Sequence, residues 1–258
     1  MTTEAIAPSS GSSSLIERFR GNVELIITPI FFGFLALTTA IVWIYSDFDF
    51  QTNDILEPSK LVNQTWEHII LTFWSTLIVL LIAIPLGIVL TRPRFRKFAS
   101  PILGLANGGQ AIPAYGLLVL FAAWLGTDVS TAIVALAVFS MLPVLRNTMV
   151  GLDQVDQAVI EAGRGMGLSK MGVLRQIELP LAVPVILAGI RIALVINVGT
   201  AALAFLIGAG GLGETINSGL KLRRDTAVFI GGALVAMLAL VIDFTAAMAE
   251  RYMRPKGV

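Results

Sequence analysis

Five long apolar stretches decide what this chain can fold into. Each is long enough for a helix that crosses a bilayer, which takes roughly 20 apolar residues. Only 14% of the 258 residues are charged, against about a quarter in soluble domains. Lipid therefore replaces water over much of the surface, and we expect an all-α membrane protein. The five stretches are residues 23–45, 69–90, 129–150, 183–207 and 227–247.

A sixth stretch, residues 101–125, is less regular. Its first half is interrupted by polar and small residues, and Pro113 precedes a cleaner apolar run from Leu117 to Leu125. Irregular backbone at membrane depth is tolerated where it lines a cavity or packs against protein. Counting this stretch predicts six transmembrane helices, the number that best fits the basic residues. The interrupting residues are Gly104, Asn107, Gly108, Gly109 and Gln110.

Basic residues orient the helices, because cytoplasmic loops carry an excess of Lys and Arg. With six spans, thirteen of the 18 basic residues lie on one side of the membrane, four lie on the other, and Arg191 lies inside a span. Both termini and the polar segment 151–181 are then cytoplasmic. We predict a disordered tail over 1–20, an extra N-terminal transmembrane helix with an external loop over 21–65, and a cytoplasmic tail over 248–258.

Several kinds of chemistry are excluded by residues that are missing. The chain has no cysteine, so disulfides, thiolate metal sites and cysteine nucleophiles are excluded. A single histidine, His68, cannot form a multi-histidine metal site, and we expect it at the outer membrane interface beside Trp66. There is no phosphate-binding loop of the form GxxxxGK[ST], so another polypeptide would have to use ATP. Arg191 and Asp243 are too few for a membrane-embedded enzyme. We therefore expect no catalytic site and no metal site, and the net charge of +1 gives no sign of nucleic-acid binding.

The segment 151–181 is polar, basic and rich in glycine, although it lies between apolar stretches. It is long enough for two short helices and a turn. Gly163, Gly165 and Gly167 each weaken a helix by up to about 1 kcal/mol relative to alanine, yet glycine permits close backbone approach and sharp turns. Two interpretations follow: an ordinary solvated loop that carries charge, or a docking surface for a soluble partner.

The order of residues in this segment resembles a known motif. Glu161-Ala162-Gly163, then Gly167, then Ile177 and Leu179-Pro180 resemble the EAA loop of permeases from binding-protein-dependent ABC importers, with Gly163 in place of the usual alanine. Four further segments, in the same order, resemble the glycine betaine/carnitine/choline branch of those permeases. They are Gln110–Pro113, Met141–Thr148, Pro184–Arg191 and Ile207–Gly213.

By this resemblance, residues 66–247 would form a five-helix type I permease core, preceded by the extra N-terminal helix. The loop would form a coupling helix that seats in a groove of a cytoplasmic ATPase. Closure of the ATPase would then move the membrane helices, and the solute would cross by alternating access. The expected coupling residues are Glu161, Ala162, Gly163, Gly165, Gly167, Ile177, Leu179 and Pro180.

The resemblance also implies partners and a solute. The partners would be a cytoplasmic ABC ATPase dimer, a second permease copy or a paralogous permease, and an extracellular or periplasmic solute-binding protein, in the plasma (inner) membrane of a prokaryote. ATP and magnesium would be used by the ATPase, and no cofactor is expected on this chain. The solute would be a compatible solute such as glycine betaine, carnitine, choline or proline betaine. The alternatives are another amino-acid-like solute, for example ergothioneine, and an ATP-independent osmotic channel.

Polar residues inside the spans are candidates for the transport path. Neutral polar groups bind a solute weakly, as a path requires, but such groups also join membrane helices. Arg191 is a candidate gate or structural anchor, because a charge at a helix centre costs roughly 2.5–3.5 kcal/mol. The path candidates are Asn107, Gln110, Tyr115, Asn197 and Thr200. We interpret four glycines after the fifth span as a docking turn for the binding protein, with a simple loop as the alternative: Gly208, Gly210, Gly211 and Gly213.

Overall fold

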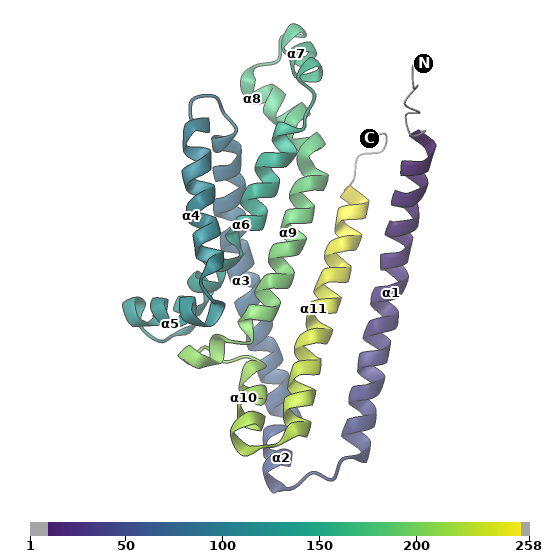
Figure 1. The fold of residues 1–258 in the computed structure, drawn as a ribbon, viewed down its shortest axis with the longest axis vertical. Helices are drawn as coiled ribbons and strands as arrows, with labels where there is room; N and C mark the ends of the chain where they lie inside the picture. Colours follow the sequence, from purple (N-terminus) through teal and green to yellow (C-terminus); the bar gives the residue numbers. More distant parts are fainter. Residues whose placement is uncertain (1–9, 254–258) are drawn as a thin grey trace, which may run out of the picture.

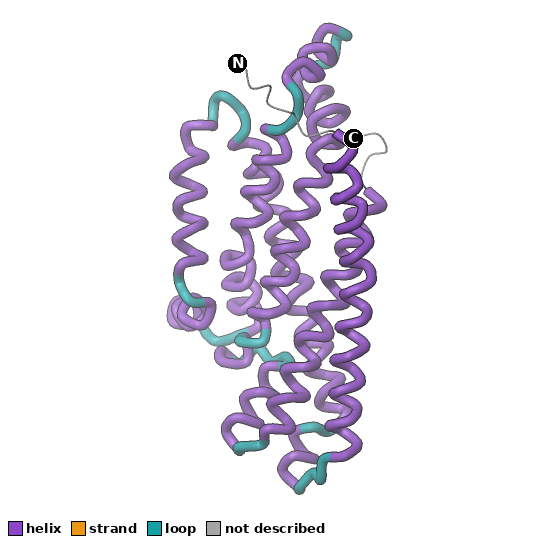
Figure 2. Tube along the Cα trace, turned by 45° about the vertical axis from the view of Figure 1, so that its right-hand side comes forward, coloured by secondary structure: helices purple, strands orange, loops and turns teal. Residues whose placement is uncertain are grey.

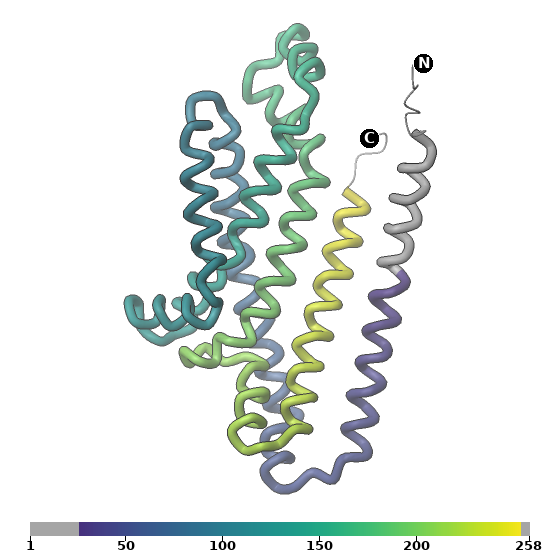
Figure 3. Tube along the Cα trace, in the orientation of Figure 1, coloured from purple at the N-terminus to yellow at the C-terminus, as the bar shows by residue number. Residues whose placement is uncertain are grey.

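The computed structural model describes the backbone of residues 10–253 and the side chains of residues 26–253. Figure 3 colours the backbone tube over residues 26–253. Helix α1 already begins at Ser10, so the structure differs from the predicted tail over residues 10–20. Extending a formed helix adds one hydrogen bond per residue without a new nucleus. Residues 1–9 and 254–258, and the side chains of Arg18 and Arg20, lie outside the described part.

Every regular element in the described part is helical (Figure 2). Five helical segments are long and apolar enough to cross a membrane, in agreement with the five predicted stretches. They are the Ile26–Tyr45 part of α1 (Ser10–Tyr45), α3 (Pro58–Leu90), α6 (Val129–Asp153), the segment Lys170–Ala201 that ends in α9 (Leu179–Ala201), and α11 (Asp225–Met253). The shorter elements are α2 (Phe50–Ile55), η1 (Arg96–Phe98), α4 (Ala99–Ala111), α5 (Ala114–Leu125), α7 (Gln157–Gly165), α8 (Lys170–Val173), η2 (Leu174–Glu178), η3 (Ala204–Ile207) and α10 (Gly213–Leu222).

The sixth predicted span is broken between α4 and α5, which meet at 101°. Ile112 has extended backbone, with φ −74° and ψ 130°, because the ring of Pro113 disfavours the helical conformation in the residue before it. Helix α4 alone is 13 residues long, or about 20 Å, which is short of the ~30 Å hydrocarbon core. The sixth stretch is therefore a bent pair of helices instead of one straight helix, and α4 carries the chain only part of the way along the bundle (Figure 1).

The fifth span also ends earlier than predicted, at Ala201 instead of residue 207. Leu203 N–H donates to the carbonyl of Thr200, and Leu206 N–H donates to that of Leu203. These bonds span three residues, so the last α-helical turn tightens into 3₁₀ geometry and the chain leaves the helix axis.

Helices α3, α6 and α9 pack together as the centre of the bundle, and glycines let them approach closely. A methyl group on Gly189 of α9 would lie 2.8 Å from the carbonyl oxygen of Pro143 in α6. One on Gly87 of α3 would lie 2.7 Å from the γ-methyl of Thr148 in α6. Membrane helices without a strong hydrophobic driving force rely on such close packing. We expect these three helices to move as a unit.

The two ends of the bundle differ. The end of α3, the start of α4, the end of α6, and both α7 and α8 lie together at one end, which we call the α7 end (Figure 1). The start of α1 and the end of α11 lie toward the same end. Helices α2 and α10 lie at the opposite end, the α10 end, where Arg224 pairs with Asp49 at 2.6 Å. Helix α1 lies at the edge beside α11, with Ile30 and Phe34 exposed.

Candidate coupling site and transport path

Helices α7 and α8 form a tip that stands beyond the neighbouring spanning helices (Figure 1). Each begins at a side-chain cap, which satisfies a backbone N–H that the helix leaves free. Asp156 accepts from the N–H of Ala158 at 2.8 Å, and Ser169 accepts from the N–H of Gly172 at 3.1 Å. The tip therefore holds its own shape away from the bundle.

The first part of the motif packs on its last part. Gly163 of α7 is buried, and a methyl group there would overlap the δ-methyl of Ile177 in η2. Since that atom is the far end of a flexible side chain, an alanine would need only a rotation of Ile177. The small residue at Gly163 and the branched residue at Ile177 thus belong to one contact, which joins α7 to the base of the tip.

The remaining motif residues have different surroundings. Glu161, Ala162 and Gly165 are exposed on α7, and no atom lies near an added methyl group at Gly165. Gly167 is exposed as well, but its φ of +90° is one that L side chains rarely adopt. The structure thus requires a small residue at Gly163 for packing and glycine at Gly167 for backbone shape, and nothing in it requires glycine at Gly165.

The tip is rooted in a spanning helix. Residues from Lys170 to Ala201 form one continuous helical segment through α8, η2 and α9. Within it, η2 is a π-helical turn in which the N–H of Leu179 donates to the carbonyl of Leu174. Pro180 has no N–H to donate, so the wider turn accommodates it without ending the helix. Leu179 is half-buried and Pro180 exposed, and a displacement of α8 reaches the membrane directly along α9.

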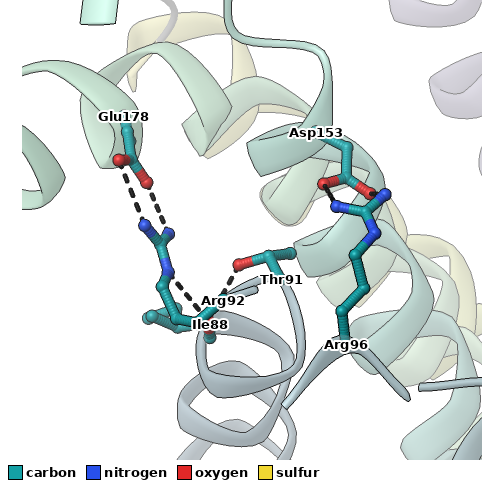
Figure 4. A network of polar contacts seen from close by, with 6 residues as sticks. All are labelled: Ile88, Thr91, Arg92, Arg96, Asp153 and Glu178. Carbon is teal, nitrogen blue, oxygen red and sulfur yellow. Dashed lines mark hydrogen bonds and ion pairs between the residues drawn. The ribbon is translucent and has the colours of Figure 1, made fainter. Parts of the chain in front are cut away.

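Two ion pairs hold the stems of the loop, and neither was predicted from the sequence (Figure 4). Arg92, just after α3, makes a double contact with Glu178, in which Nη1 lies 3.1 Å from Oε1. Arg96 in η1 makes a double contact with Asp153, at 2.9 and 3.1 Å. The available signal was Glu178 itself, an acid at the start of an apolar span, because a carboxylate buried there needs a cation.

Gln110 has a specific structural partner. Its Nε2 donates to the carbonyl oxygen of Phe139 in α6 at 3.1 Å. In a regular helix that carbonyl would accept from the residue four positions later, which is Pro143 and has no N–H. Gln110 therefore supplies the donor that Pro143 removes, and it joins α4 to α6. The proline was visible in the sequence, but the helix that compensates for it was not.

The other path candidates do not share one surface. Asn197 is fully buried, and its side-chain amide donates to Thr76 of α3 at 2.9 Å. Thr200 is half-buried, and its hydroxyl donates to the carbonyl of Ile196 in its own helix. Asn107 on α4 and Tyr115 on α5 are exposed. The geometry therefore places Asn197 between helices and leaves Asn107 and Tyr115 as the candidates on open surface.

Arg191 of α9 pairs with Asp243 of α11, with Nε–Oδ1 at 2.5 Å and Nη2–Oδ2 at 2.8 Å. Two parallel bonds match the planar guanidinium to the carboxylate. Both side chains are about a fifth exposed. Of the two interpretations of Arg191, this arrangement favours the structural anchor over the gate.

The glycine turn at the α10 end lies mostly inside the protein. Gly210, Gly211 and Gly213 are buried, and only Gly208 of the four glycines is exposed. Gly211 N–H donates to the carboxylate of Glu67 in α3 at 2.9 Å. A methyl group on Gly210 would overlap that carboxylate, and φ at Gly210 is +77°. The glycines therefore let the turn close on α3, and a docking surface here would have to use other residues around Gly208.

His68 is fully buried, so its expected place at the lipid interface is wrong. It lies two residues from Trp66, which is exposed, because two residues turn a helix by about 200°. The Nε2 of His68 lies 2.9 Å from the carbonyl oxygen of Val198 and must carry the proton, since a carbonyl only accepts. Val198 is in the last turn of α9, where carbonyls lack helical partners. His68 thus caps α9 from α3.

Comparison with known proteins decides the family. The family described as binding-protein-dependent transport system inner membrane component matches residues 83–255. The chain belongs to this family. The match begins within α3, so α1 and α2 lie outside it.

The chain is similar to transport permeases of known systems. The choline transport system permease protein OpuBB of Bacillus subtilis (strain 168) is 42% identical over 199 residues, 77% of this chain and 91% of that protein. The osmoprotectant import permease protein OsmY of Salmonella typhimurium is 44% identical over 191 residues, 74% of this chain and 81% of that protein. A chain from inward-facing structures of the MetNI methionine ABC transporter is 27% identical, with a TM-score of 0.67 over 76% of this chain and 98% of that chain. The resemblance to importer permeases and the multi-pass membrane fold are confirmed.

Proposed function

We propose that this inner membrane component is the permease subunit of an ATP-driven importer whose ATPase is a separate polypeptide, docked on the α7–α8 tip. The observation that carries the proposal is a protruding tip continuous with the spanning helix α9. Three apolar side chains are exposed on it: Val159 at 43%, Met166 at 76% and Met171 at 54%. Methionine adapts its shape to a partner surface, so a soluble partner explains this exposure.

We infer that the solute is a compatible solute such as glycine betaine, carnitine, choline or proline betaine. The support is the names of similar proteins, which include a choline permease, a glycine betaine/carnitine/choline permease and an osmoprotectant permease. Another amino-acid-like solute such as ergothioneine is the alternative within the importer class. An ATP-independent osmotic channel is the alternative outside it, and it gives no reason for the exposed apolar tip.

The proposal extends to partners and place. ATP and magnesium bind the partner ATPase dimer, and this chain binds no cofactor of its own. A second permease, identical or paralogous, completes the transport path, and a solute-binding protein delivers the solute at the α10 end. The α7 end then faces the cytoplasm of a prokaryote, with both termini on that side of the plasma membrane, as the basic residues indicate.

Uptake by the reconstituted complex tests the function. The importer is isolated through a tag on this chain and placed in liposomes, and uptake of labelled glycine betaine, choline and carnitine is measured with and without ATP on the α7 side. We expect uptake of at least one of them that requires ATP. Equal uptake without ATP would favour the channel, and no uptake of any of the three would refute the solute class.

The docking surface is tested with matched variants. Met166→Asp and Met171→Asp place charge on the tip, and we expect each to reduce copurification of the ATPase. Leu220→Asp places the same charge on an exposed leucine of α10 at the opposite end and should leave copurification unchanged. Retention of the ATPase by both tip variants would contradict the proposed docking site.

A further inference from the structure

The short connection between α3 and α4 contacts both stems of the coupling loop. Arg92 and Arg96, four residues apart, pair with Glu178 and Asp153 (Figure 4). Glu178 immediately precedes α9, and Asp153 is the last residue of α6. We call these four residues the arginine clasp. The five-residue stretch 92–96 thus contacts the coupling loop both where it leaves the bundle and where it returns.

The Arg92 arm of the clasp is fixed in orientation. Its Nε donates to the carbonyl of Ile88 at 3.2 Å, in the last turn of α3, while both terminal nitrogens contact Glu178. The side chain of Glu178 is only 6% exposed. A buried carboxylate left without its cation is strongly unfavourable, so the α3 end and the η2 turn stay in register.

The Arg96 arm is open to water. The side chains of Arg96 and Asp153 are 60% and 38% exposed, and exposed ion pairs add little to stability. Arg96 begins η1, which leads directly into α4. This pair therefore links α4 to the stem of α6 without being essential to the fold.

The clasp adds charged contacts to the apolar packing between these helices. Gly151 packs α6 on α9, with 3.0 Å from an added methyl group to the carbonyl oxygen of Ala182, and Gly87 packs α3 on α6. The near end of helix α4 packs Ile102 and Leu103 against the buried cluster around Val144 and Leu145, whereas its other face presents the exposed Gly104 and Gly108 with no atom near either. Its bond through Gln110 lies at its far end, so at its near end Arg96 is the polar link to the stem of α6.

We propose that the arginine clasp ties the α3–α4 connection to the coupling loop and makes α4 follow the tip, so that its four residues are positioning residues for transport. The proposal rests on the proposed function of the tip. When the ATPase displaces α7 and α8, the stems carry Arg92 and Arg96 with them. Helix α4, which carries Asn107, then shifts together with α6 and α9 instead of lagging behind them. Loss of the clasp uncouples ATP hydrolysis from solute movement.

The exposed pair gives the cleaner test, because its loss does not threaten folding. Arg96→Gln and Asp153→Asn are compared with Arg94→Gln, a matched neighbour whose guanidinium lies 5.8 Å from the Phe95 ring centre. The measurement is solute taken up per ATP hydrolysed in the reconstituted complex. We expect both clasp variants to lower this ratio at least threefold, the control to leave it unchanged, and the exchanged double variant Arg96→Asp/Asp153→Arg to restore it within twofold.

A distance measurement separates coupling from general damage. The chain has no cysteine, so spin labels on Ser100→Cys in α4 and Lys170→Cys in α8 attach to no other site of this chain. When ATP binds the partner ATPase, we expect the distance distribution in the complex to stay constant with the unaltered clasp and to shift or broaden with Arg96→Gln.

The outcomes distinguish the two proposals. If the unaltered complex shows no ATP-dependent uptake, the proposed function fails. If it transports, but the clasp variants keep its uptake per ATP and its label distances, the clasp proposal alone is overturned. Failure of the exchanged pair to restore the ratio would also overturn it, because the charges themselves would then not be the cause.

Discussion

Gln110 and Pro143 offer a sharp test of how this bundle is held together. Pro143 leaves the carbonyl of Phe139 without its helical donor, and Gln110 on α4 fills the gap at 3.1 Å. Gln110→Leu removes the donor while keeping a branched side chain of similar bulk. Pro143→Ala returns an N–H to α6, so the carbonyl no longer needs Gln110.

The expected energies follow from the environment. A buried carbonyl left without a donor costs about 1–3 kcal/mol, and hydrogen bonds between membrane helices average about 0.6 kcal/mol in double-mutant cycles. Because Gln110 is half-buried, we expect Gln110→Leu to cost about 1 kcal/mol. In the Pro143→Ala background the same change should cost close to nothing. The expected coupling energy between Gln110→Leu and Pro143→Ala is therefore about 1 kcal/mol. That exceeds the ~0.5 kcal/mol by which the effects of two independent substitutions depart from additivity.

The assay is equilibrium unfolding of the purified chain in mixed micelles with increasing SDS, followed by the fluorescence of its 4 tryptophans. The original chain, both single variants and the double variant complete the cycle. Gln176→Leu, on an exposed glutamine at the α7 end, controls for the loss of an amide without a known partner carbonyl. Equal losses from Gln110→Leu in both backgrounds would refute the argument, since the bond to Phe139 would then not be its cause.

Three further predictions concern single contacts. Gly163→Ala should keep ATP-dependent uptake within twofold, whereas Gly163→Val should abolish most of it by displacing η2; equal uptake would contradict the packing argument. His68→Ala should lower the unfolding free energy by about 1–3 kcal/mol, because the carbonyl of Val198 loses its donor, and His68→Gln, which keeps an N–H, should lose less. Asp243→Asn should cost about 1.5–3 kcal/mol in the same unfolding assay without changing uptake per folded molecule, and a selective loss of uptake would identify Arg191 as a gate instead of an anchor.

Much of the architecture was readable from local properties. The five apolar stretches became the five spanning segments, since length and composition alone decide whether a helix can cross a bilayer. The motif in residues 161–180 also marked the protruding tip, because Gly167 and Pro180 act on their own backbone. Pro113 signalled irregularity in the sixth stretch, but the 101° bend became visible only in the structure, where α4 and α5 both pack against α6.

Roles that need two distant residues were not readable. Gln110 and Asn197 had the residue types of a transport path, and only their neighbours across the bundle, Phe139 and Thr76, identify them as contacts between helices. The glycines after α9 had the composition of an exposed turn, yet Glu67 draws Gly211 inward. In each case the side chain had two possible uses, and the partner helix selected one.

By itself, the sequence determined that the chain lies in a membrane, which segments are apolar enough to cross it, and which polar segment is the candidate docking site, because hydropathy, charge and backbone preference act over short stretches of chain. Only the tertiary structure decided that Arg92 and Arg96 hold Glu178 and Asp153, residues that lie 86 and 57 positions away in the chain. Charges pair by proximity in space, and the folding of α3, α6 and α9 into one bundle creates that proximity.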